Sequence, residues 1–120
     1  MPVRAVRGAT QLQMDDREEM VGAVVELVTE VLTRNGLTTD QLISIIFTST
    51  PDLTVEFPAA AARTLGIGDV PLLCAQELAV GGALPRVVRL MAHVETTLDR
   101  GSLQHVYLRG AEVLRQDLAQ

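Results

Sequence analysis

Apolar and polar residues alternate along parts of the chain, and this period of two predicts β-strands. Residues 3–8 and 87–96 follow it, so each stretch would turn one apolar face toward a core. Residues 42–48 form an almost wholly apolar, β-branched run, which is typical of a strand buried on both faces. Shorter apolar runs predict further strands at residues 70–74, 103–108 and 111–114.

Two other stretches repeat their apolar residues at the spacing of a helix. The longer begins at residues 15–19, where an aspartate can cap the helix and acidic groups favour the positive end of its dipole, and ends at Asn35-Gly36. The shorter begins at Pro58 and ends at Gly66. The apolar face of the longer helix consists of Met20, Val21, Val24, Leu27, Val28, Val31 and Leu32.

These elements predict one domain over residues 1–120, of the α+β (α/β-like) class, with a mixed sheet of about five strands. One long and one short helix can cover only one face of such a sheet. Because the central strands are apolar on both sides, we expect the other face to be buried against further subunits, which makes the protein a homo-oligomer.

The charge and the lysine content of the chain argue against some partners and some kinds of chemistry. The net charge of −5 argues against nucleic acid, because phosphate backbones attract basic surfaces. All ten cationic residues are arginine, so Schiff-base and pyridoxal chemistry, which need a lysine amine, are excluded. Base composition of the genome can explain arginine on the surface, but arginine also suits paired recognition of carboxylates or phosphates.

Location is predicted from the cysteine content and the start of the chain. The single cysteine cannot form an internal disulfide, and residues 1–4 lack the apolar core of a signal peptide. No apolar run approaches the length that spans a membrane. We therefore expect a cytoplasmic protein with no membrane partner.

Several kinds of reactive site are poorly supported. Only two histidines, His93 and His105, are present, which is too few for a histidine-rich metal site. Cys74 could act as a nucleophile with His105 as its base, but a lone cysteine at the end of an apolar strand is usually a small core residue. Gly81-Gly82 lacks the Lys-Ser/Thr that a phosphate loop requires.

The remaining chemical groups suit a small dianion. They are either solvated surface groups or parts of one site, and Arg7 and Arg89 favour the second interpretation because apolar residues flank them within predicted strands. The set consists of Arg7, Arg63, Cys74, Glu77, Arg89, Tyr107 and Arg115.

Seven short motifs, in order through nearly the whole chain, resemble the AroH-class monofunctional chorismate mutases. Any one of them alone would be a weak signal, whereas their common order and spacing are specific. The motifs are Val6-Arg7-Gly8-Ala9-Thr10, Thr48-Ser49-Thr50-Pro51-Asp52-Leu53, Phe57-Pro58-Ala59, Val70-Pro71 with Cys74-Ala75-Gln76-Glu77, Arg86-Val87-Val88-Arg89, His105-Val106-Tyr107-Leu108 and Val113-Leu114-Arg115.

The resemblance implies a homotrimer with a barrel-like centre and an active site in each cleft between subunits. It also implies the reaction, in which chorismate rearranges to prephenate on the shikimate pathway to phenylalanine and tyrosine. This Claisen-type isomerisation needs no cofactor, no metal and no covalent intermediate, which fits a chain without lysine.

The resemblance also implies roles for individual residues. Arg89 faces the ether oxygen of the breaking bond, where negative charge grows. Glu77 and Cys74 bind the ring hydroxyl. Arg7 and Tyr107 hold the carboxylate of the enolpyruvyl side chain and fold it over the ring.

Four further substrate-binding residues follow from the same resemblance. Phe57 and Arg63 come from the adjacent subunit, and Arg115 covers the mouth of the pocket. Leu73 stands where relatives often carry a hydroxyl residue. Two other departures are Ala60, where a lysine is common, and Gln116, where proline is usual.

Two alternatives from other classes remain open. A trimeric enamine/imine deaminase of similar architecture would also bind a substrate carboxylate through an arginine. A trimer that binds a carboxylate metabolite as a sensor would have no catalytic activity. Turnover separates the three, because a mutase should consume chorismate with no added metal or cofactor and should leave 2-aminoacrylate untouched.

Overall fold

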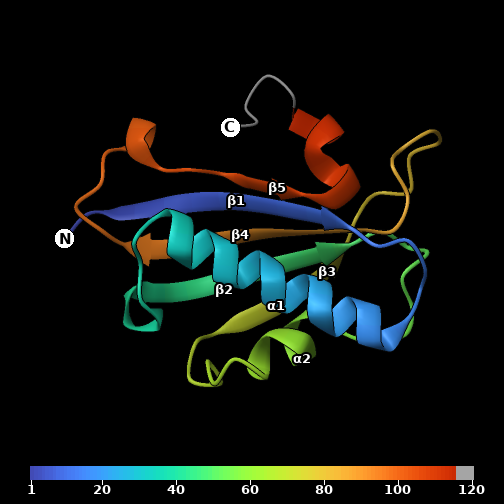
Figure 1. The fold of residues 1–120 in the computed structure, drawn as a ribbon, viewed down its shortest axis with the longest axis horizontal. Helices are drawn as coiled ribbons and strands as arrows, with labels where there is room; N and C mark the ends of the chain where they lie inside the picture. Colours follow the sequence, from blue (N-terminus) through green and yellow to red (C-terminus); the bar gives the residue numbers. More distant parts are fainter. Residues whose placement is uncertain (116–120) are drawn as a thin grey trace.

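The computed structural model describes residues 1–115 of the chain, and of Arg115 only the backbone. One mixed sheet of five strands forms the centre, and two α-helices lie against it (Figure 1). The elements in chain order are β1 (Val3–Gln11), α1 (Arg17–Arg34), η1 (Thr39–Gln41), β2 (Leu42–Ser49), α2 (Pro58–Arg63), β3 (Leu72–Gln76), β4 (Val87–Glu95), η2 (Arg100–Ser102), β5 (Val106–Leu108) and η3 (Arg109–Arg115), where η denotes a 3-10 helix.

The strands follow the order β3-β2-β4-β1-β5 across the sheet. β4 is antiparallel to both of its neighbours, β1 and β2, while the edge strands β5 and β3 run parallel to β1 and β2 respectively. β1 and β2 therefore run in the same direction on either side of β4, and α1 lies in the connection between them. The parallel neighbours β2 and β3 are joined by a crossover that contains α2. The predicted mixed sheet of five strands is therefore confirmed.

Helix α1 begins and ends at the residues that the sequence indicates. Asp16 is its N-cap, and the Asp16 carboxylate accepts a hydrogen bond from the Glu19 backbone N–H at 2.9 Å. Asn35 is the C-cap, and Gly36 follows with φ +61°, a conformation that glycine adopts without steric cost. The cap and the stop signal thus fix the length of the helix.

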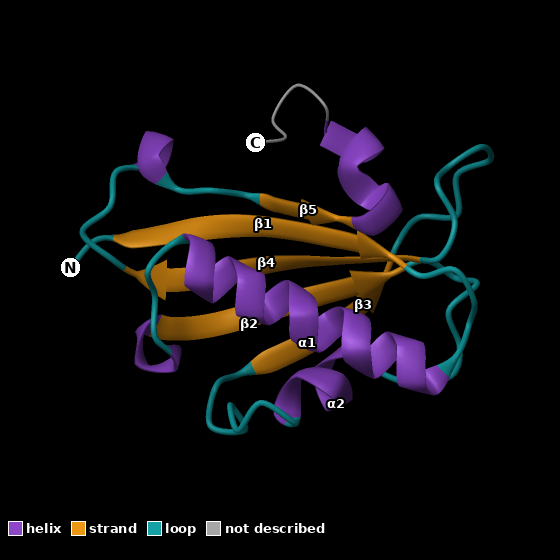
Figure 2. Ribbon diagram, viewed as in Figure 1, coloured by secondary structure: helices purple, strands orange, loops and turns teal. Residues whose placement is uncertain are grey.

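Both α-helices lie on the same face of the sheet, as expected (Figure 2). Their apolar sides meet alternate residues of the strands, so that Leu27 of α1 and Ala62 of α2 share one core with Phe47 and Leu90. Gly8 permits this close approach, because a Cβ there would lie 3.2 Å from Leu27. The core is built almost entirely from aliphatic side chains.

Three predicted strands differ from the structure. The stretch predicted at 103–108 forms a strand only at Val106–Leu108. The run at 70–74 begins as a strand only at Leu72 and continues to Gln76, because the backbone N–H of Val70 bonds to Ile67 in a turn. The predicted strand at 111–114 is wrong, since these residues belong to η3. Arg109 has φ +57°, which ends β5 and turns the chain back over the sheet.

Within residues 1–115, the face of the sheet away from α1 is partly covered at one edge. There η3 packs on the sheet, with Ala111 against Ala9 and Tyr107. Towards the other edge, Ile46 and Met91 are 37% and 42% exposed. Burial of this face by other subunits stays a prediction.

Candidate active site

A cavity of about 320 Å³ opens on the face of the sheet opposite α1. Arg7 and Arg89 point to this face because their neighbours Val6, Val88 and Leu90 point into the helix-side core. Four residues that the resemblance assigned to catalysis therefore line one site, although they come from distant parts of the sequence. The lining consists of Arg7, Gly8, Ala9, Ile46, Thr48, Glu77, Arg89, Leu90, Met91 and Tyr107.

Four lining residues form one row across the sheet. Tyr107 of β5 pairs with Ala9 of β1, Ala9 pairs with Arg89 of β4, and Arg89 pairs with Thr48 of β2. Paired residues of adjacent strands point to the same side, about 5 Å apart. The register thus sets Tyr107, Arg89 and Thr48 along the floor of the cavity, and Ala9 leaves room between the phenol and the guanidinium.

Glu77 is not part of this row, because it follows the last residue of β3, but its side chain contacts two residues of the row. Its backbone N–H donates to the Ser49 carbonyl at 2.9 Å, which holds it beside the end of β2. The Glu77 carboxylate oxygen Oε2 lies 3.3 Å from Arg89 Nε and accepts a hydrogen bond from the Thr48 hydroxyl. A carboxylate and a guanidinium thus meet inside the cavity.

The contact between Glu77 and Arg89 is an ion pair rather than an aligned hydrogen bond. Among the described residues, the buried Arg89 Nε has no partner in hydrogen-bond geometry. The Arg89 side chain as a whole is 43% exposed, so part of its guanidinium is accessible from the cavity. Such a group can interact with an anionic or polar ligand without leaving the sheet.

Arg7 and Tyr107 complete the site on the β1 side. The backbone N–H of Arg7 donates to His105 Nδ1 at 3.0 Å, which ties β1 to the residue before β5. Tyr107 is 9% exposed and packs against Ala9 and Ala111. Arg7 also lines a neighbouring cavity of about 460 Å³ with Arg4, Arg100 and His105, so three arginines border that cavity.

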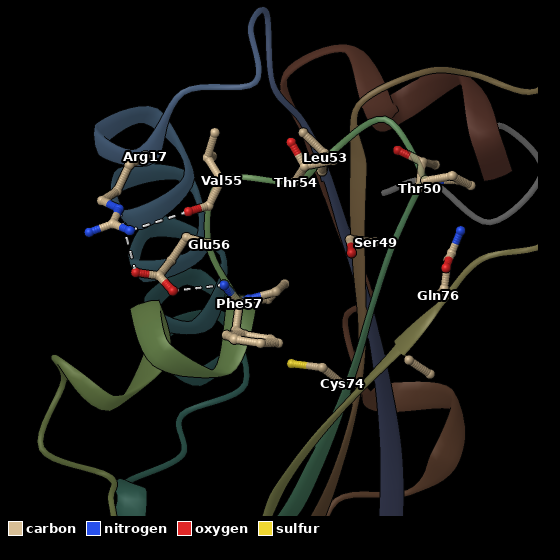
Figure 3. Close-up of a pocket in the computed structure, with 13 residues that line it drawn as sticks. Arg17, Ser49, Thr50, Leu53, Thr54, Val55, Glu56, Phe57, Cys74 and Gln76 are labelled. Carbon is tan, nitrogen blue, oxygen red and sulfur yellow. Dashed lines mark hydrogen bonds and ion pairs between the residues drawn. The ribbon is translucent and has the colours of Figure 1, made fainter.

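Phe57 and Cys74 lie in a different cavity, of about 520 Å³ (Figure 3). Cys74 Sγ accepts a hydrogen bond from the Ala59 backbone N–H at 3.4 Å, so the thiol faces α2. Phe57 is 69% exposed. Across this cavity from Cys74, Arg17 contacts Glu56 at 3.8 Å. Within residues 1–115, Cys74 and Glu77 therefore line two different cavities, although the resemblance assigned both to one hydroxyl.

The other candidate residues are dispersed. Arg63 ends α2 and is exposed, and Leu73 is 61% exposed on the strand face opposite Cys74. The backbone of Arg115 ends η3, while its side chain and Gln116 lie outside the described part of the chain. The described part of one chain thus places Phe57 and Cys74 in a different cavity from Arg7, Glu77, Arg89 and Tyr107.

The described residues do not form a nucleophilic cysteine site or a metal site. Cys74 and His105 line different cavities, so the structure does not form the thiol–imidazole pair of a nucleophilic site. Within residues 1–115, no group of three or more histidine, cysteine or acidic side chains is placed to hold a metal ion. No helix in that range is long and apolar enough to cross a membrane.

Thr48 and Ala9 also line the site, although the resemblance gave neither of them a role. The alternation of β2 puts Thr48 on the same side as Ile46, away from Phe47, so its face was readable from the sequence. The contact of Thr48 with Glu77 could not be predicted from the sequence, because it depends on the relative register of two strands, which only the fold defines.

Comparisons with known proteins agree on one family. The family model for chorismate mutase type I matches residues 3–118. The chain is 45% identical to the chorismate mutase AroH of Thermus thermophilus over 97% of its length and 96% of that protein. It is 36% identical to the chorismate mutase AroH of Bacillus subtilis, over 99% of the chain and 94% of the relative.

A solved structure supports the same assignment. The chorismate mutase from Clostridium thermocellum superposes with a TM-score of 0.90 and 44% identity, covering 92% of this chain and 98% of that one. Sequence and fold therefore agree over almost the full length of both proteins. The resemblance noted from the motifs is confirmed, and the chain belongs to the chorismate mutase type I family.

Proposed function

We propose that residues 1–120 form a single chorismate mutase domain that rearranges chorismate to prephenate, in phenylalanine and tyrosine biosynthesis. The observation that supports this most is the cavity where Arg7, Glu77, Arg89 and Tyr107 meet. The guanidinium groups of Arg7 and Arg89 suit a dianionic substrate on which further negative charge develops during the reaction. The reaction makes no bond to the protein and requires no metal or cofactor.

Arg89 is the group that we place against the ether oxygen. As the C–O bond breaks, negative charge grows on this oxygen, and a guanidinium fixed on a central strand stabilises that charge without reorganising. Glu77 accepts a hydrogen bond from the ring hydroxyl and faces the ring, which becomes relatively positive. Arg7 and Tyr107 hold the side-chain carboxylate, so that the two carbons that form the new bond approach each other.

The proposal includes a homotrimer with a barrel-like centre and active sites shared between subunits. The exposed Ile46, Leu73 and Met91 support burial of the sheet face against neighbouring chains. Phe57 and Cys74 line one cavity within the chain. If Phe57 reaches the Arg89 cavity of a neighbour, Cys74 comes with it, so we assign Cys74 to the adjacent subunit.

The remaining roles follow from this arrangement. Arg63, which is exposed at the end of α2, accompanies Phe57 and adds positive charge from the neighbouring chain. Arg115, at the end of η3, covers the mouth of the site. The enzyme works in the cytoplasm, where its single cysteine stays reduced.

Turnover tests the activity directly. Purified protein is mixed with chorismate in the presence of a metal chelator, and prephenate is measured by chromatography. We expect stoichiometric conversion that continues with chelator present, whereas 2-aminoacrylate in a parallel reaction should disappear no faster than it does without protein. Binding of chorismate without conversion would favour a sensor, and consumption of 2-aminoacrylate would favour a deaminase.

Mixing two inactive variants tests the shared site. Arg89→Ala removes the guanidinium, while Phe57→Asp places a negative charge beside the dianionic substrate and leaves the core intact, since Phe57 is exposed. When the two variants are mixed in equal amounts and exchange subunits at random, half of the subunits keep Arg89 and the other half keep Phe57. Each site takes Arg89 from one subunit and Phe57 from its neighbour, so about one quarter of the sites contain both native residues. About one quarter of the activity should therefore return. No recovery after proven exchange would place the whole site within one chain.

A further inference from the structure

Two groups contact the same oxygen of Glu77. The Thr48 hydroxyl donates to Oε2, and Arg89 Nε lies 3.3 Å from that oxygen. Within residues 1–115, the structure gives Oε1 of Glu77 no hydrogen-bond or ion-pair partner. One carboxylate oxygen is thus held by the protein, and the other is available to a ligand.

The sheet fixes the three backbones that make this contact. Thr48 pairs with Arg89 on one side and with Ala75 of β3 on the other. The backbone N–H of Glu77 donates to the carbonyl of Ser49, the residue after Thr48. The Thr48 hydroxyl therefore has a defined place, whereas the longer Glu77 side chain depends on its contacts for its orientation.

We propose that Thr48 is a positioning residue that acts through Glu77. A carboxylate held only by Arg89 would be free to turn and to pair with two guanidinium nitrogens at once, which is the strongest geometry for these groups. That pairing would occupy N–H groups that the substrate needs and would turn Oε1 away from the ring hydroxyl. By holding Oε2, the Thr48 hydroxyl keeps both charged groups available to the substrate.

The proposal rests on the proposed function of this cavity, and substitution by Val and Ser tests it. Thr48→Val keeps the branched shape and removes the hydroxyl, so kcat/KM for chorismate should fall at least about tenfold, the usual effect of losing a hydrogen bond to a charged group. Thr48→Ser keeps the hydroxyl and should retain activity within about threefold. A structural role in packing would give the reverse order, because serine lacks the methyl group.

Thr10→Val is a matched control on the same sheet. Thr10 lies in β1, is fully buried, and within the described residues its hydroxyl has no hydrogen-bond partner. It points into the helix-side core with its alternate neighbours Val6 and Leu12. The same substitution should therefore leave turnover unchanged, which separates loss of the Thr48 contact from a general effect of valine in this sheet.

A double-mutant cycle with Glu77→Ala decides whether Thr48 acts through the carboxylate. Once the carboxylate is gone, adding Thr48→Val should reduce kcat/KM no further. Losses that multiply in the double variant, or a Thr48→Val enzyme as active as the wild type, would overturn the inference while leaving the proposed function intact. A wild-type protein that does not convert chorismate would instead overturn the proposed function on which the inference rests.

Discussion

Replacement of Arg89 by lysine tests how the site stabilises charge, because the variant keeps the charge and loses the geometry. Arg89 lies on the central strand β4, paired with Ala9 and Thr48, so its Cβ cannot shift without disturbing both neighbouring strands. A lysine ammonium reaches about as far as the guanidinium carbon, which is about 1.3 Å short of the terminal nitrogens. A hydrogen bond of ordinary length to the ether oxygen would then be lost.

The size of the effect follows from the role that we give to this donor. Removing one donor to a developing oxyanion typically costs a factor of about 10² to 10³ in kcat, or about 2.7–4 kcal/mol. The Glu77 carboxylate, 3.3 Å from Arg89 Nε, adds to the loss because a flexible ammonium can settle beside it rather than beside the substrate. We therefore expect kcat for Arg89→Lys to fall by at least about 10²-fold.

The assay compares kcat and KM for chorismate in the variant and the wild type. Arg34→Lys is the control, because Arg34 forms an ion pair with Glu30 on the surface of α1 at 2.9 Å and should not affect turnover. Urea unfolding and sedimentation of both variants exclude loss of fold or assembly. Turnover of Arg89→Lys within about fivefold of the wild type would refute the idea that a two-pronged donor faces the ether oxygen.

Three further changes test other parts of the structure. Hydrogen bonds from the Thr54 hydroxyl and backbone hold the pKa of Asp15 below its usual 3.8, so they stabilise the fold above that pH and this contribution is lost as the pH falls through the lowered value. Urea unfolding of Asp15→Asn should thus show a weaker dependence on pH between about 4 and 2, and an unchanged dependence would contradict the assignment. Arg109 has φ +57°, so Arg109→Gly should be more stable than Arg109→Ala by about 1 kcal/mol, whereas equal unfolding midpoints would show that the turn is unstrained. Arg115→Ala should raise KM about tenfold and change kcat less than about twofold, and a large fall in kcat at constant KM would place Arg115 in the reacting part of the site.

Much of the sheet was predictable because the side-chain pattern of a strand is local. The alternation around Arg89 placed the guanidinium on the face opposite Val88 and Leu90, and the structure confirms this placement. The predicted ends of α1 were also correct, since Asp16 and Asn35 act through bonds within a few residues.

The errors come from features that depend on backbone conformation or on distant contacts. Residues 111–114 have the composition of a strand, but the positive φ of Arg109 redirects the chain, and Ala111 then packs against Ala9 from β1. The pairing of Thr48 with Glu77 depends on how β2 and β3 are registered. The sequence does not encode either contact in a short motif.

The candidate site shows a third limit, which concerns the assembly. Motifs place Cys74 and Glu77 three residues apart, yet these residues line different cavities of the chain. Side chains alternate between the two faces of an extended segment, and Glu77 is the third residue after Cys74. The thiol therefore faces α2, whereas the carboxylate faces Arg89. How the two cavities combine depends on how neighbouring subunits pack, which local sequence does not determine.

A crystal structure with a bicyclic mimic of the rearranging substrate tests the central claim most directly. We predict that a terminal nitrogen of Arg89 lies about 3 Å from the ether oxygen of the mimic, with Phe57 of a neighbouring subunit against the same ligand. An Arg89 guanidinium that stays on Glu77 and points away from that oxygen would contradict the account.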